Sequence, residues 1–359
     1  MKNCLLISLL RDVTLVKRLS LKEWDLLIRQ ARSTGLTARL YYFIKKNELV
    51  DFIPAIVLKH FISEWMYFTK LYQSVGWELS ELKIALDKKN LPVQLMKGTA
   101  YVALDLEVSK GRIFSDIDLL FSHDSIDLAE SALMNAGWMG THHNEYDRNY
   151  YRQWMHEIPP LRHVKRQSVL DVHHNILPPT AKIKVNAEKI LANIIKVDGE
   201  NIFCLSPEDL VLHSATHLFH EGDFVHGLRD ISDLDLLLKE FSEENVFWVK
   251  LIERAVELNL GRPLYYGLRY TSFFLKTSIP DSVICSVNRF APNGLMLRVM
   301  DFVFFRALMP DHPSCDVRWT SLARWLLYIR SHWLRMPMYL LVPHLLRKSW
   351  MGLVGGTTH

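Results

Sequence analysis

The spacing of apolar residues changes twice along the chain, and this constrains the fold more than any other feature of the sequence. Up to about residue 90, apolar residues recur at intervals of three and four. One such run contains Leu21, Trp24, Leu27, Ile28 and Ala31. Between residues 91 and 203, the segments 91–96, 112–121 and 168–176 are typical of strands, with a helical segment at 124–137. After the helix-start signature Ser206, Pro207, Glu208, the pattern is helical again.

These three zones predict an α+β protein in which a small mixed β-sheet core is flanked by helical regions. We expect an N-terminal helical region over residues 1–85, an α/β core over 86–203 and a C-terminal helical region over 204–359. With 359 residues, 49% of them hydrophobic, the chain can bury a sizeable core.

Charge and cysteine content exclude few classes of function. A net charge of +4 is too small to indicate nucleic-acid binding by itself, but it is compatible with a phosphate-bearing ligand. The cysteines lack paired metal-binding spacing and fit free thiols in a reducing cytoplasm; they are Cys4, Cys204, Cys285 and Cys315. We expect neither a signal peptide nor a membrane span, because apolar runs stop short of about 18 residues. The expected location is the cytoplasm, including the inner membrane surface.

Two acidic residues lie one residue apart in the apolar segment 112–121. Side chains alternate between the faces of a strand, so Asp116 and Asp118 are expected on the same face. Two like charges on a half-buried strand are costly unless a cation neutralises them, and oxygen ligands favour Mg²⁺ or Mn²⁺. The alternative is an edge strand whose acids face solvent.

Residues on either side strengthen the interpretation as a metal site. Gly98 and Thr99 follow a predicted strand, where backbone N–H groups at a helix start can hold phosphate oxygens. The nearby cations are Lys97 and Arg112, and Ser115 adjoins the first acid. Downstream, alternation places Asp171 and His173 on one face of another strand, which supplies a third carboxylate. Such a site suits polarisation of a nucleoside triphosphate and orientation of an attacking hydroxyl.

The order of these motifs resembles the DNA polymerase β-like nucleotidyltransferase superfamily. The motifs are Lys97-Gly98-Thr99-Ala100, then R-x-x-x-D-I-D-L-L from Arg112, then the D-x-H strand. Within it, the chain is most similar to an uncharacterised bacterial nucleotidyltransferase group associated with surface-polysaccharide gene clusters. The resemblance implies a nucleotidyltransferase core that uses Mg²⁺ or Mn²⁺. It implies the following roles: Gly98 and Thr99 form the phosphate turn, Asp116, Asp118 and Asp171 are catalytic metal ligands, and Lys97 and Arg112 line the triphosphate.

A histidine-rich stretch follows at residues 213–226. His213, His217, His220 and Glu221 could be drawn as a zinc site, but their spacing is not H-E-x-x-H, and we do not expect a dedicated zinc there. Arg229 and Asp233 are four residues apart on a predicted helix and could form an ion pair. Alternatively, this region closes the nucleotide or acceptor pocket, and its candidate lining residues are His173, His217, Arg229 and Asp230.

The C-terminal region interleaves tryptophans with basic residues. The set comprises Trp319, Trp325, Trp333, Trp350, Arg318, Arg324, Arg330, Arg335, Arg347 and Lys348. Such a mixture suits an anionic membrane surface, a partner groove or a nucleic-acid backbone, but tryptophans at helical spacing most often belong to the core.

Two hypotheses for function follow. The first is an enzyme that moves a nucleoside monophosphate from a nucleoside triphosphate to an acceptor that the sequence does not identify. His173 and the carboxylate of Asp171, the third acid, are both candidates for the general base of this enzyme. The second is a catalytically silent nucleotide-binding or assembly subunit of a polysaccharide-synthesis system. Three uncompensated acids favour the enzyme.

Overall fold

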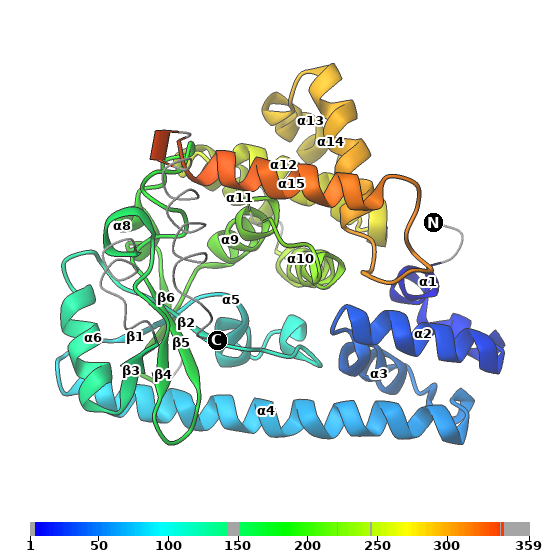
Figure 1. Ribbon diagram of the computed structural model, residues 1–359, viewed down its shortest axis with the longest axis horizontal. Coiled ribbons are helices and arrows are strands. Elements are labelled where there is room, and N and C mark those ends of the chain that lie inside the picture. Colours follow the sequence, from blue (N-terminus) through cyan, green and yellow to red (C-terminus); the bar gives the residue numbers. More distant parts are fainter. Residues whose placement is uncertain are drawn as a thin grey trace, which may run out of the picture.

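The computed structural model describes residues 4–141, 151–197, 199–220, 222–244, 246–337 and 339–340. Helices surround a seven-stranded mixed sheet (Figure 1), which confirms the predicted α+β class. The sequence-based predictions for Glu221, Arg347, Lys348 and Trp350 lie outside the described residues.

The N-terminal region is helical, as predicted. Its α-helices are α1 (Leu5–Arg11), α2 (Leu21–Ser33), α3 (Thr37–Lys46) and α4 (Ala55–Asp87). A capping box starts α2: the Ser20 hydroxyl accepts from the Glu23 backbone N–H, and the Glu23 carboxylate accepts from that of Ser20. The 33 residues of α4 give it a length of about 50 Å. It runs along one side of the molecule from α2 and α3 to the sheet (Figure 1).

The sheet has the strand order β3-β4-β5-β2-β1-β7-β6. Its strands are β1 (Val93–Leu95), β2 (Ile117–Leu120), β3 (Trp138–Gly140), β4 (Leu161–His163), β5 (Val169–His173), β6 (Ile195–Lys196) and β7 (Ile202–Cys204). The pairs β2–β5 and β1–β7 are parallel, and the other neighbours are antiparallel. The intervening helices include α5 (Lys97–Ala103), α6 (Ile126–Asn135) and α8 (Ala187–Leu191).

The strand predicted over residues 112–121 is shorter than expected. It begins at Ile117, so Asp116 lies just before the strand. The preceding segment turns at Gly111, which has φ +72° and approaches the α3 backbone so closely that a Cβ atom would lie 2.5 Å from Arg39 Cα. Only glycine tolerates both conditions. Glycine at this position therefore lets the loop before β2 pack directly against α3.

The C-terminal region forms a layer of packed helices. They are α9 (Pro207–His220), α10 (Gly227–Phe241), α11 (Phe247–Glu257), α12 (Gly261–Leu275), α13 (Asp281–Val287), α14 (Gly294–Ala307) and α15 (Thr320–Arg335). Pro207 is the first residue of α9, as the helix-start signature predicted. Rings of Phe219, Tyr270 and Phe304 contact one another and join α9, α12 and α14. Buried residues of all three regions belong to one continuous core.

The division into three regions agrees with element ends but stays a prediction. Helix α4 ends at Asp87, and β7 ends at Cys204. Among the described helices, none is both long enough and apolar enough to cross a membrane.

The tryptophans in and just before α15 are not core residues, so the expectation that they belong to the core was wrong. Trp319, Trp325 and Trp333 are 51%, 56% and 49% exposed. The buried face of α15 instead carries the smaller side chains of Thr320, Ala323, Leu327 and Ser331. That a membrane or a partner covers the exposed aromatic face stays a prediction.

A buried ion network connects α3, the loop before β2 and α10. Arg39 is fully buried, and its Nη1 atom lies 2.6 Å from Asp233 Oδ1. Arg112 Nε lies 2.6 Å from the other oxygen, Asp233 Oδ2. Arg39 also donates to the Val108 carbonyl. One carboxylate therefore pairs with two guanidinium groups from different regions of the chain, of which that of Arg39 is fully buried.

We expect Asp233→Asn to lower the free energy of unfolding by about 3–5 kcal/mol, because it leaves two buried cations without a counter-charge. Urea denaturation followed by circular dichroism measures this change. The control is Asp25→Asn, which removes the exposed Arg29–Asp25 pair, with side chains 56% and 66% exposed, and should cost less than about 1 kcal/mol. Equal effects of the two substitutions would contradict the structural role of the network.

Candidate active site

The parallel pairing of β2 with β5 brings two predicted metal ligands together. Asp118 and Asp171 are register partners in neighbouring strands, so their side chains leave the same face of the sheet. Asp118 is buried, at 4% exposure, whereas Asp116 and Asp171 are partly exposed. Asp116, just before β2, accepts a hydrogen bond from the Ser115 hydroxyl at 3.0 Å. The structure thus places Asp118 and Asp171 on one sheet face, and Asp116 precedes β2 close enough to repel Asp171.

Two side chains, one cationic and one ionisable, lie in contact with the Asp118 carboxyl group. Lys97 Nζ and His173 Nε2 each lie 3.0 Å from Asp118 Oδ1. Burial opposes ionisation of this carboxyl, but Lys97 and His173 outweigh it and keep its pKa well below the usual range. Asp118 is therefore an anion at neutral pH.

Asp171 is in the opposite electrostatic situation. Burial, followed by repulsion from Asp118, Asp116 and Glu157, raises its pKa to about 7. Despite Lys97 and His173, the carboxyl groups near Asp171 therefore repel one another, and a divalent cation with oxygen ligands would reduce this repulsion. The donor set fits Mg²⁺ or Mn²⁺. The three acids do not form a group whose ligand atoms all lie within 4.8 Å of one another, so holding one ion together would require side-chain rotation.

The predicted phosphate turn begins a helix directly after β1. Lys97 is the first residue of α5 and has φ +47°. A Cβ atom on Gly98 would lie 2.4 Å from the Phe114 ring and 2.7 Å from Arg112 Nη1, so this position requires glycine. Thr99 is buried, and its hydroxyl faces the Met96 carbonyl at 3.5 Å. Gly98 thereby allows Arg112 to approach the start of α5.

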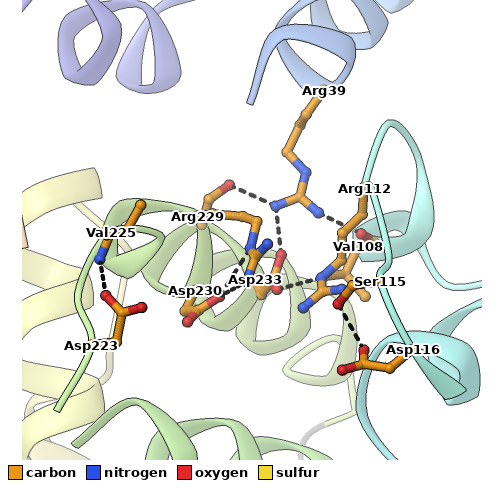
Figure 2. Close-up of polar contacts among 11 residues, drawn as sticks. Arg39, Val108, Arg112, Ser115, Asp116, Asp223, Val225, Arg229, Asp230 and Asp233 are labelled. Atoms are coloured by element: carbon orange, nitrogen blue, oxygen red, sulfur yellow. Dashed lines mark hydrogen bonds and ion pairs between the residues drawn. The ribbon is translucent and has the colours of Figure 1, made fainter. Parts of the chain in front are cut away.

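Figure 2 shows Arg39 and Arg112 converging on Asp233, with Arg229 and Asp230 on the same helix. The predicted pair of Arg229 with Asp233 was wrong. Arg229 Nη2 instead lies 3.1 Å from Asp230 Oδ1, while Arg39 and Arg112 occupy the Asp233 carboxylate. Arg39 was missed because nothing in the amphipathic pattern of α3 distinguishes it from a surface arginine.

Two histidines of α9, His213 and His217, face this region as neutral imidazoles. Burial, followed by the positive charge of Lys97, holds the pKa values of His213 and His217 well below the usual range. Within the described residues, these histidines do not join a group of three ligand atoms close enough to share a metal ion. Their role in lining a pocket stays a prediction.

Glu157 is a site residue that the sequence analysis missed. An isolated antiparallel bridge places it opposite His173, and its Oε2 atom lies 3.3 Å from His173 Nδ1. No local motif marks this residue, because the contact depends on how the segment before β4 pairs with the end of β5. His173 therefore has a carboxylate at each of its ring nitrogens.

We expect the stability of the metal-free protein to report the raised pKa of Asp171. The pKa of this carboxyl is about 3.9 in the unfolded chain and about 7 in the folded protein. Its contribution to stability is therefore complete below about pH 4 and is lost as the pH rises to 7. Asp171→Asn should therefore gain about 1–2 kcal/mol over the wild type between pH 5 and pH 7. Urea denaturation in a chelating buffer measures this difference.

The exposed residue Asp124, substituted to Asn, serves as the control and should show no such gain. A pH-independent difference between Asp171→Asn and the wild type would contradict the electrostatic description of this site.

Comparison with known proteins complements this geometry. No curated protein matches the chain, and no solved structure matches it. A family model described as "uncharacterised nucleotidyltransferase" matches residues 20–276, which is more than half of the chain and includes every site residue discussed above. The chain therefore belongs to this nucleotidyltransferase family.

Proposed function

We propose that this nucleotidyltransferase moves a nucleoside monophosphate from a nucleoside triphosphate to an acceptor hydroxyl or phosphate, in a reaction that depends on Mg²⁺ or Mn²⁺. The observation that carries the proposal is the placement of Asp118 and Asp171 in register on parallel strands, with Asp116 beside them and Lys97 in contact. Membership of the polymerase β-like superfamily, with its association with polysaccharide synthesis, is part of this proposal.

Asp116, Asp118 and Asp171 would hold the metal. When bound, it would neutralise charge on the triphosphate and lower the pKa of the acceptor oxygen. The chain's own contribution is the anionic sheet face, whose charge is evident in the pKa of about 7 for Asp171. The same repulsion would favour binding of a divalent cation there.

Lys97 and Arg112 would orient the triphosphate. Lys97 Nζ lies 3.0 Å from Asp118, so it stands next to any phosphate near that carboxylate. Arg112 uses Nε for Asp233, which directs its terminal nitrogens toward the start of α5 at Gly98. Asp233 and Arg39 act as positioning residues because they hold Arg112 in this orientation.

Of the two candidates for the general base, the geometry favours Asp171. His173 lies between Asp118 and Glu157, so each of its ring nitrogens already lies next to a carboxylate. His173 is only 3% exposed, whereas Asp171 is partly exposed, so the Asp171 carboxylate is the more accessible of the two to an acceptor. Asp171 would accept the proton of an acceptor hydroxyl.

Nucleotide binding is expected to raise the melting temperature. A ligand that binds only the native state, at one hundred times its dissociation constant, stabilises that state by about 2.7 kcal/mol. We expect ATP, CTP, GTP or UTP with Mg²⁺ to produce such a shift, and Asp116→Ala to remove its Mg²⁺-dependent part. Differential scanning fluorimetry measures both. Asp124→Ala, at an exposed position after β2, should retain the shift, and an unmoved melting curve with all four nucleotides would refute the proposal.

Substitution of Asp171 should separate binding from chemistry. Asp171→Asn keeps the shape of the side chain and deletes its charge, so nucleotide affinity should fall only modestly. Transfer of label from the triphosphate to acceptors in a cell extract should fall by about a hundredfold or more, equivalent to roughly 3 kcal/mol of transition-state stabilisation. Full activity in this variant would defeat the three-acid site. Nucleotide binding without transfer by the wild type would indicate a silent subunit.

A further inference from the structure

A second group of side chains adjoins the acidic site but is not used by the proposed reaction. It consists of His156 and Glu157, which precede β4, and His173, the last residue of β5. The backbone fixes their relative positions: Ile158 N donates to Val172 O at 3.0 Å, and His174 N donates to His156 O at 2.8 Å. The three side chains therefore belong to two paired segments.

The potential ligand atoms of these residues converge. One atom from each residue, an imidazole nitrogen or a carboxylate oxygen, lies within 4.8 Å of the other two. Within the described ranges, this is the only group of three histidine, cysteine or acidic side chains with that property. The distance of 3.3 Å between His173 Nδ1 and Glu157 Oε2 is about that between two ligands of a tetrahedral zinc ion with bonds of about 2.0 Å.

His156 supplies an unsatisfied nitrogen at this point. Its Nδ1 atom is buried and has no hydrogen-bond partner, and its ring centroid lies 5.3 Å from that of His173. A buried polar atom without a partner destabilises the folded state. A metal ion bound among the three side chains would provide the missing partner.

The contacts of His173 match those of a metal-bound histidine. Its Nε2–H can donate to Asp118 Oδ1 at 3.0 Å, which leaves a lone pair on Nδ1, a buried atom that has no hydrogen-bond partner and lies 3.3 Å from Glu157 Oε2. A lone pair facing a carboxylate oxygen is repulsive unless a proton or a metal cation lies between them. Metal-bound histidines commonly donate their other N–H to a carboxylate, as His173 would to Asp118.

We propose that His156, Glu157 and His173 bind one divalent transition-metal ion of the zinc class. Two imidazoles and one carboxylate suit Zn²⁺ and its neighbours, whereas Mg²⁺ prefers oxygen ligands. Three protein ligands leave a coordination position open to water or to another ligand. The ion would also fix the ring of His173 against Asp118. Only this last consequence, a link to the nucleotide site, depends on the proposed function.

Cobalt provides a direct spectroscopic probe. The full-length chain, freed of metal by a chelator, is titrated with Co²⁺ and followed by visible absorption, with Zn²⁺ and Mg²⁺ as competitors. We expect one equivalent to bind, Zn²⁺ to displace it and a hundredfold excess of Mg²⁺ not to do so. Failure to bind one equivalent of Co²⁺ or Zn²⁺ would overturn the proposal.

Variants locate the ion. His156→Ala and Glu157→Gln should each weaken Co²⁺ binding by at least about 10- to 100-fold, the loss typical even of an outer partner. His174→Ala is the matched control, because His174 is the next residue along and its ring contacts Met155 O and His123. It should bind as the wild type does. Wild-type affinity in both ligand variants, or equal loss in the control, would overturn the assignment.

Two further measurements distinguish loss of the metal site from other causes of weakened Co²⁺ binding. The urea midpoint of each variant identifies loss through unfolding, and Glu157→Gln, which preserves side-chain shape, decides the result if His156→Ala is unstable. Asp116→Asn should lose the Mg²⁺-dependent response to nucleotide but keep Co²⁺ binding. Failure of the transition-metal site is thereby distinguished from failure of the proposed nucleotidyl transfer.

Discussion

A buried carboxylate, Asp118, is the charge around which the centre of this protein is arranged. At 4% exposure it would be strongly destabilising by itself, and Lys97 from α5 and His173 from β5 compensate it. These contacts tie the helix after β1 to the two central parallel strands. Because one oxygen of Asp118 accepts both contacts, α5, β2 and β5 must keep their relative positions for the carboxylate to remain satisfied.

A second buried charge cluster joins parts of the protein that are far apart in the sequence. Asp233 of α10 balances Arg39 of α3 and Arg112 of the loop before β2, so the N-terminal and C-terminal helices meet beside the sheet. Arg112 belongs to both systems, because it is held by Asp233 and touches the α5 start at Gly98. The helical regions therefore position a residue of the nucleotide site as well as covering the core.

The two proposed metal sites differ in chemistry although they are neighbours. The acidic sheet face offers oxygen ligands, which suit Mg²⁺, while the group around His156 offers two imidazoles and one carboxylate. The Asp118–His173 contact joins them, so a change in one site would reach the other through a single hydrogen bond of 3.0 Å. If both proposals hold, two different cations would bind close together without competing for the same ligands.

The sequence by itself determined the helix–sheet–helix order, the two separate strands that carry Asp118 and Asp171, and the turn at Lys97 and Gly98. Each of these depends on local periodicity or on alternation along one strand, which a linear sequence records directly. The tertiary structure alone decided that β2 pairs with β5 in parallel register, that Asp233 binds Arg39 and Arg112 instead of Arg229, and that the α15 tryptophans face outward. It also decided that Glu157 meets His173. These contacts join residues from separate segments, and their geometry depends on packing and on the compensation of buried charge, which no local spacing encodes.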